Sequence, residues 1–119
     1  ARPAVAVDGR MLRHEWIETA MGLMKTDALD HHADHFFPGC QDIAWDVAGL
    51  TIETGLDLTE ALAASLPDPH LPRLMPFYRT AYAAWRTGYC TLAAQSLPVG
   101  PDRRGFERLA TRCRKAGGP

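Results

Sequence analysis

The second half of the chain carries apolar side chains at intervals of three and four residues, which is the period of an α-helix. The longest such stripe predicts one helix over residues 71–92. Proline fits the first turn of a helix and not its interior, so Pro72 and Pro76 place the start of this helix at one of the two. The stripe consists of Leu71, Leu74 or Met75, Tyr78, Tyr82, Trp85, Tyr89 and Leu92.

Three shorter helices are predicted beside the long one. The first begins near Gln41, ends at Gly55 and places one acid, Asp46, on an apolar face. The second covers residues 58–66, and the third begins at residues 100–102. The apolar side of this last helix is formed by Phe106, Leu109, Ala110 and Cys113, and arginines occupy its other side.

Extended chain is predicted near the N-terminus. Residues 3–7 alternate small and β-branched side chains before an Asp8-Gly9 turn, and residues 23–26 form a second extended stretch. Together they predict a small strand pair around residues 11–16. The expected fold is one domain over residues 1–119, mainly helical (α+β), with a short hairpin or strand pair packed on a bundle of about four helices.

Composition narrows the classes of function. No apolar run approaches the ~20 residues of a membrane span, so we expect no membrane anchor. The three cysteines, Cys40, Cys90 and Cys113, are far apart and odd in number. This pattern indicates reduced thiols in a cytoplasmic protein rather than a disulfide framework.

Charge is divided unevenly along the chain. Residues 1–70 hold twelve acidic residues against four Lys or Arg, and residues 71–119 hold two against nine. Three interpretations are open: a metal or phosphate site in the acidic half, a basic surface for a partner, or attraction between the halves, within one chain or across a homodimer. Nucleic acid is not an expected partner, because the net charge is not positive and no known reader motif is present.

Two motifs resemble those of a known family. Residues 22–27 have the sequence GLMKTD, an extended stretch that leads into Asp27, and residues 42–49, DIAWDVAG, open a helix. The pair resembles the C-lobe of the aminoglycoside phosphotransferase and choline kinase branch of the kinase-like superfamily. In that family a strand ends in the Mg²⁺-binding Asp, and a Gly-Asp-Pro-x-x-Asp-Leu-Ala segment begins a buried helix. The resemblance implies that Asp27 binds Mg²⁺ and that Asp42 and Asp46 are structural braces.

Further upstream, the segment DGRMLRHEWI begins at Asp8, where the family has a catalytic loop with an Asp followed five residues later by Asn. The resemblance makes Asp8 the catalytic residue. Arg13 stands at the Asn position and the chain contains no Asn, so His14 or Glu15 would supply the second metal ligand. The implied function is a fragment of an ATP- and Mg²⁺-dependent phosphotransferase for a small-molecule hydroxyl, inactive without its nucleotide-holding lobe.

Each of these aspartates also has a structural explanation. Asp8 and Asp27 belong to a residue type that is common in turns. Asp46 can be a buried structural acid that backbone N–H groups or a cation neutralise. Both interpretations stay open at this point.

The segment from Asp30 to Gly39 is predicted to be a loop rich in His and Asp. If the loop is helical, spacings of four residues bring side chains together that could bind Zn²⁺ or Ni²⁺. The chain would then be a small helical metal-binding or protein-interaction module, whereas a solvated loop is the structural alternative. The residues concerned are Asp30, His31, Asp34 and His35.

The long helix offers candidates for an acceptor-substrate cleft, because the C-terminal helices of the resembled family shape that cleft. The candidates are Tyr78, Tyr82, Trp85 and Arg86. An aromatic stripe of this kind is also typical of a helix core. The basic row of the last helix predicts a solvated face or a counterpart of the acidic half. The row consists of Arg103, Arg104, Arg108, Arg112, Arg114 and Lys115.

Overall fold

Four helices and a strand pair make up the regular structure of the described part of the chain. The computed structural model describes residues 2, 4–5, 12, 16–25, 42–65 and 68–117. In chain order the elements are β1 (Trp16–Thr19), β2 (Gly22–Lys25), α1 (Ala44–Thr54), α2 (Thr59–Ser65), α3 (Leu71–Gln95) and α4 (Pro101–Ala116). The prediction of a mainly helical fold with a short N-terminal strand pair and about four helices is confirmed.

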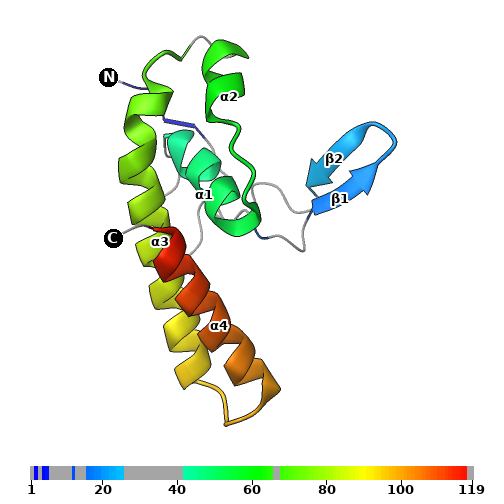
Figure 1. Ribbon diagram of the computed structural model, residues 1–119, viewed down its shortest axis with the longest axis vertical. Coiled ribbons are helices and arrows are strands. Elements are labelled where there is room, and N and C mark those ends of the chain that lie inside the picture. Colours follow the sequence, from blue (N-terminus) through cyan, green and yellow to red (C-terminus); the bar gives the residue numbers. More distant parts are fainter. Residues whose placement is uncertain are drawn as a thin grey trace.

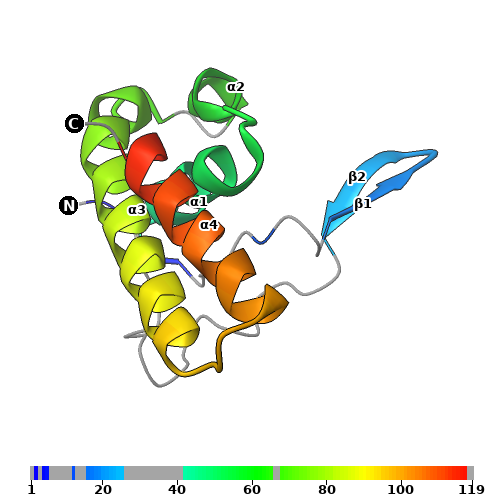
Figure 2. The ribbon, with the colours of Figure 1, turned by 60° about the horizontal axis from the view of Figure 1, so that its bottom comes forward.

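The long helix α3 is the element against which the other helices pack (Figure 1). α4 runs antiparallel beside the C-terminal half of α3, and α2 lies near the N-terminal end of α3. α1 packs against α3 and also touches α4, so that these three helices lie side by side when the molecule is turned (Figure 2). Their junction positions the side chains discussed below.

The core lies between α1 and α3. Eight residues of α1 are buried, although the helix has only 11 residues. Asp46 is 5% exposed, so the prediction that this acid lies on an apolar face is confirmed. The two described cysteines, Cys90 and Cys113, are free and buried. The main buried apolar cluster consists of Ala44, Val47, Ala48, Ile52, Leu71, Met75, Tyr82, Ala83 and Cys113.

Glycine and proline residues lie at or near the ends of α1 and α3. α1 ends at Gly55, whose φ of 81° lies in the left-handed region and whose N–H donates to the carbonyl of Thr51 at 2.8 Å. α3 begins at Leu71, before both prolines, and Pro76 lies inside the helix. The expected start at a proline is therefore wrong. Pro72 lies in the first turn of α3, where a residue without an N–H loses no helical hydrogen bond.

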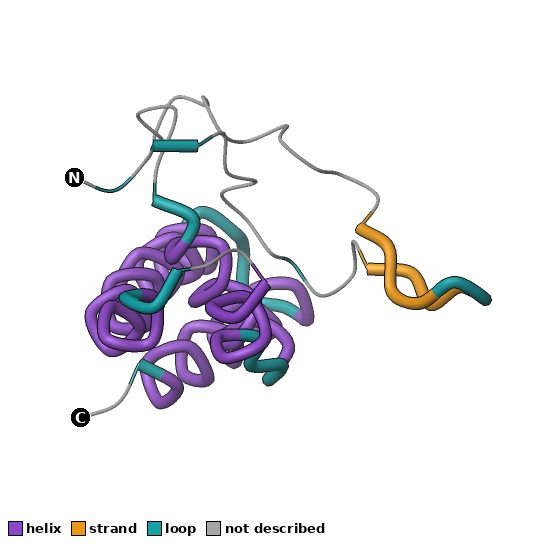
Figure 3. The backbone as a smooth tube through the Cα atoms, turned by 90° about the horizontal axis from the view of Figure 1, so that it is seen from above, coloured by secondary structure: helices purple, strands orange, loops and turns teal. Residues whose placement is uncertain are grey.

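The strands form an antiparallel hairpin closed by Ala20 and Met21. Gly22 has a φ of 112°, a conformation that side-chain-bearing residues rarely adopt, and the Thr19 hydroxyl donates to its carbonyl at 2.6 Å. The extended stretch predicted at residues 23–26 overlaps β2, which pairs with β1. Of residues 3–7, the described part includes two, and Val5 forms an isolated bridge. The hairpin projects away from the helices (Figure 3).

A glycine in α1 makes the closest approach to the core. A Cβ atom on Gly49 would lie 2.6 Å from Cε2 of Tyr82, whose side chain is fully buried. We expect Gly49→Ala to lower the free energy of unfolding by about 1–3 kcal/mol, because the ring has no free space to move into. Urea unfolding measures the change.

The matched control is Gly88→Ala in α3, where an added Cβ would meet nothing within 4 Å. This variant should gain roughly 0.5–1 kcal/mol from the higher helix propensity of alanine. Equal effects of the two substitutions would contradict the packing argument.

Candidate functional site

The residues that the resemblance assigns to chemistry lie outside the described residues. They are Asp8, His14, Glu15 and Asp27. The residues of the alternative His/Asp metal loop also lie outside the described residues: Asp30, His31, Asp34 and His35. The structure describes what flanks them in the chain. β2 ends at Lys25, two residues before Asp27, and α1 begins two residues after Asp42.

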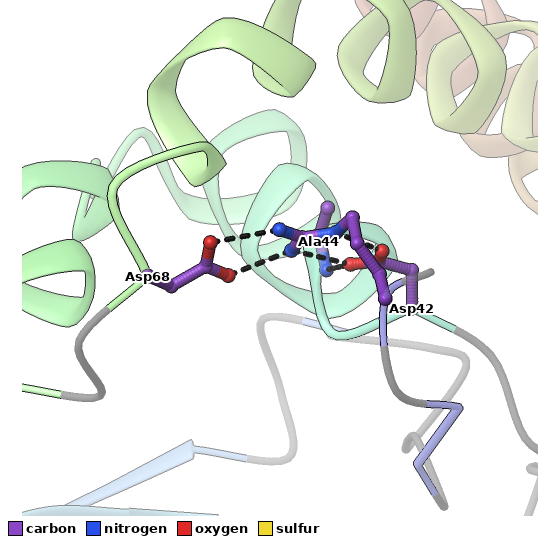
Figure 4. Close-up of polar contacts among 4 residues, drawn as sticks. Asp42, Ala44 and Asp68 are labelled. Carbon is purple, nitrogen blue, oxygen red and sulfur yellow. Dashed lines mark hydrogen bonds and ion pairs between the residues drawn. The ribbon is translucent and has the colours of Figure 1, made fainter.

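A clamp formed by Arg2, Asp42 and Asp68 lies at the start of α1 (Figure 4). The guanidinium donates through Nε and Nη2 to the two carboxylate oxygens of Asp42, the Nη2 bond measuring 2.9 Å. It donates through Nη1 and Nη2 to the two oxygens of Asp68, both at 2.7 Å. Two-pronged pairs of this kind are among the strongest and most directional ion pairs in proteins.

The clamp joins segments that are far apart in the chain. Oδ1 of Asp42 also accepts the N–H of Ala44 at 2.9 Å, and this N–H belongs to the first turn of α1, where the backbone has no helical acceptor. The carbonyl of Asp68 accepts the N–H of Leu71 at the start of α3 at 3.3 Å. One arginine therefore ties the N-terminal segment to the starts of two helices.

Arg2 and the two carboxylates of the clamp stabilise each other's charges. Hydrogen bonds from Arg2 lower the pKa of Asp42, although burial of the carboxyl opposes this effect. They lower the pKa of Asp68 in the same way, and the two carboxylates raise the pKa of Arg2. Asp42 thus keeps its negative charge, which the Arg2 guanidinium balances. This environment suits a structural brace better than a metal ligand.

A second polar cluster, the Glu53 cluster, lies where α1, α3 and α4 meet. Glu53 is 4% exposed and Arg86 is 7% exposed. Oε1 of Glu53 accepts from Nε of Arg86 at 2.7 Å and from the hydroxyl of Tyr82 at 3.0 Å. Arg112 of α4 approaches Oε2 at 3.7 Å. Burial alone would lower the pKa of Arg86, but Glu53, with Cys90 and Tyr82, raises this pKa overall.

Sequence reasoning did not single out Glu53. It follows Asp46 by seven residues, so two helical turns place both acids on the same side of α1. That spacing was the signal available in the sequence. Asp46 itself is buried and is not without a partner.

The aromatic candidates for a substrate cleft lie along α3. Tyr82 is fully buried, with its ring centroid 5.1 Å from that of Trp45 and 5.5 Å from that of Trp85. Tyr78 is partly buried, and burial raises the pKa of its hydroxyl. Tyr82 and Arg86 contribute to the Glu53 cluster. A role for these residues in an acceptor cleft stays a prediction.

No protein-family model, no curated protein and no solved structure matches this chain. In the described part of the chain, no helix combines the length and the apolar character that a membrane span needs. Among the same residues, no three His, Cys, Asp or Glu side chains are grouped as they would be around a metal ion.

The clamp generates a prediction about acid stability. The pKa values of Asp42 and Asp68 are lowered in the folded state. The two carboxylates therefore add to the free energy of unfolding above the unfolded pKa of about 3.9, and this stabilisation is lost as the pH falls through the folded pKa values. Arg2→Gln should therefore lower the urea midpoint at neutral pH, and its difference from the unsubstituted protein should shrink below about pH 4.

Urea titrations at several pH values between neutral and acid measure this difference. Arg73→Gln is the control, since Arg73 is exposed on α3. It should leave the midpoint nearly unchanged at each pH. If the urea midpoint of Arg2→Gln stays below that of the unsubstituted protein by the same amount into the acid range, the clamp is contradicted.

The Glu53 cluster generates a second prediction. Glu53→Leu should cost about 3–5 kcal/mol of unfolding free energy, because it leaves the Arg86 charge buried without its partner. Glu53→Leu combined with Arg86→Met should cost less than Glu53→Leu alone, because the second substitution removes the stranded charge. The exposed Glu60→Gln in α2 serves as the control. A double variant as unstable as the sum of its parts would contradict the pairing.

Proposed function

We propose that this chain is the C-lobe-like part of an ATP- and Mg²⁺-dependent phosphotransferase that acts on a small-molecule hydroxyl. In this proposal Asp8 is the catalytic residue, Asp27 is a Mg²⁺ ligand, and Asp42 and Asp46 are structural braces. Nucleotide binding requires a further lobe, and the chain alone is inactive.

The observation that supports the proposal most is the path of the chain around the two motifs. β2 ends two residues before Asp27, so an extended stretch does lead toward this carboxylate. α1 is a buried helix whose first turn contains Asp46 and whose start is fixed by Asp42. A strand leading to an acid and a buried helix opened by two acids are the two features of the resembled family.

The clamp supports the same proposal through positioning. Phosphoryl transfer needs little covalent help from the protein and depends on the placement of charged groups around the phosphate. Arg2 precedes Asp8 by six residues and is held by four hydrogen bonds, two to Asp42 before α1 and two to Asp68 before α3. The segment that leads to Asp8 is therefore anchored at its beginning.

The chemistry of the proposed ligands favours Mg²⁺ at two of the three positions. Asp27 and Glu15 carry carboxylate oxygens, the donors that Mg²⁺ prefers, whereas the imidazole nitrogen of His14 suits transition metals better. Glu15 is accordingly the better second ligand. When bound, the ion would neutralise charge on the phosphate oxygens.

Calorimetry with ATP and Mg²⁺ on the full protein that contains this chain tests the proposal. We expect Mg²⁺-ATP to bind, and Asp27→Ala to weaken this binding by roughly 10-fold or more. Glu15→Ala should weaken it more than His14→Ala does. The control, Glu60→Ala, removes an exposed carboxylate from α2 and should change nothing. The absence of Mg²⁺-ATP binding, or binding that Asp27→Ala leaves intact, would refute the proposal.

A further inference from the structure

A row of exposed cations follows one face of α4. Four basic residues, together with Glu107 and Thr111, line a hollow of about 500 Å³, which we call the α4 groove. The four are Arg104, Arg108, Arg112 and Lys115. The hollow is open to solvent, and all six lining residues belong to α4.

The charge of the α4 groove is not neutralised by the rest of the described residues. Arg104, Arg108 and Lys115 form no ion pair with a carboxylate in this part of the chain, and Arg112 reaches Glu53 only at 3.7 Å. The acid that lines the groove, Glu107, already binds Nε of Arg103 at 3.1 Å. The groove therefore keeps a strong positive potential.

The acidic half does not provide the missing counter-charge where it is described. Asp42 and Asp68 bind Arg2, Asp57 binds Arg79 at 2.6 Å, and Glu53 binds Arg86 at 2.7 Å. Each of these acids has a cation outside the groove, and only Glu53 also approaches a groove cation, Arg112, at 3.7 Å. The described acids thus leave most of the row on α4 without a counter-charge, so that it is available to a ligand from outside.

The spacing of the cations indicates the kind of anion. Residues three and four apart project from the same helix face, and a rise of about 1.5 Å per residue separates neighbours by about 4.5–6 Å and the outermost pair by about 16 Å. A single small anion can contact one or two of these side chains, whereas linked anionic groups can contact more. Three of the four are arginines, whose planar fork matches phosphate oxygens.

We propose that the α4 groove binds a small polyanion with at least two linked phosphate groups. Nucleoside polyphosphates and inorganic polyphosphates share this chemistry. The site is separate from the proposed Asp8 and Asp27 centre in its residues and needs no divalent metal. It does not depend on the phosphotransferase proposal.

Calorimetry with sodium tripolyphosphate in the presence of EDTA, on the full protein, tests this site. Inorganic phosphate is the single-anion probe, and ATP without Mg²⁺ shows whether a nucleoside adds to binding. We expect one tripolyphosphate per chain, bound roughly 10-fold or more tightly than phosphate, with an affinity that falls as salt is raised. Asp27→Ala should bind tripolyphosphate normally, so that failure of this site and failure of the phosphotransferase proposal give different results.

The decisive comparison uses two double variants that lose the same charge. Arg104→Gln with Arg108→Gln removes two groove cations and should weaken tripolyphosphate binding roughly 10-fold or more. Arg73→Gln with Arg114→Gln removes two exposed cations that do not line the groove and should retain binding within about 3-fold. Circular dichroism checks that both double variants are folded. Lys115→Gln alone should weaken tripolyphosphate binding by a smaller factor.

Three outcomes would overturn the inference. The first is no tripolyphosphate binding, and the second is an equal loss in both double variants, which would indicate diffuse attraction by the whole surface. The third is a single-stranded oligonucleotide that binds the groove far more tightly than tripolyphosphate, which would make α4 a nucleic-acid surface instead.

Discussion

The packing of the three main helices depends on one buried carboxylate. Removing Glu53 from water is unfavourable unless cations and hydrogen-bond donors meet it inside the protein. Its partners, Tyr82, Arg86 and Arg112, come from α3 and α4, whereas Glu53 itself belongs to α1. Because these groups must converge on two oxygen atoms, the cluster restricts how α1 can rotate or slide against its neighbours. One turn earlier, Gly49 leaves room for the Tyr82 ring that delivers the hydroxyl.

A second network fixes the opposite end of the same helix. Asp42 accepts the N–H of Ala44 in the first turn of α1 and also binds Arg2. Arg2 in turn binds Asp68 before α3. The short helix α1 is thus held at its start by the clamp and at its end by the Glu53 cluster. This arrangement matters for the proposed chemistry, since the clamp residues lie on both sides of the proposed centre in the sequence: Arg2 precedes Asp8, and Asp42 follows Asp27.

The two networks also explain what becomes of the uneven charge along the chain. Four acids, Asp42, Asp68, Asp57 and Glu53, are paired with Arg2, Arg79 and Arg86. Among the described residues, these pairs leave Arg104, Arg108 and Lys115 of α4 without counter-charges. The polyanion site that we infer on α4 follows from this distribution. The phosphotransferase proposal rests on different residues, near the N-terminus.

The sequence by itself determined the helices, because their signals are local. A period of three and four residues marks α3 and α4, and Gly55 ends α1 at the predicted position since its left-handed backbone favours glycine. The strand partner of β2 was not predicted, because pairing depends on a hairpin turn that the alternation of residues 3–7 does not reveal. The tertiary structure alone decided the Glu53 cluster and the Arg2 clamp. Arg2 meets carboxylates 40 and 66 residues away, and helix packing rather than local pattern brings such distant groups together.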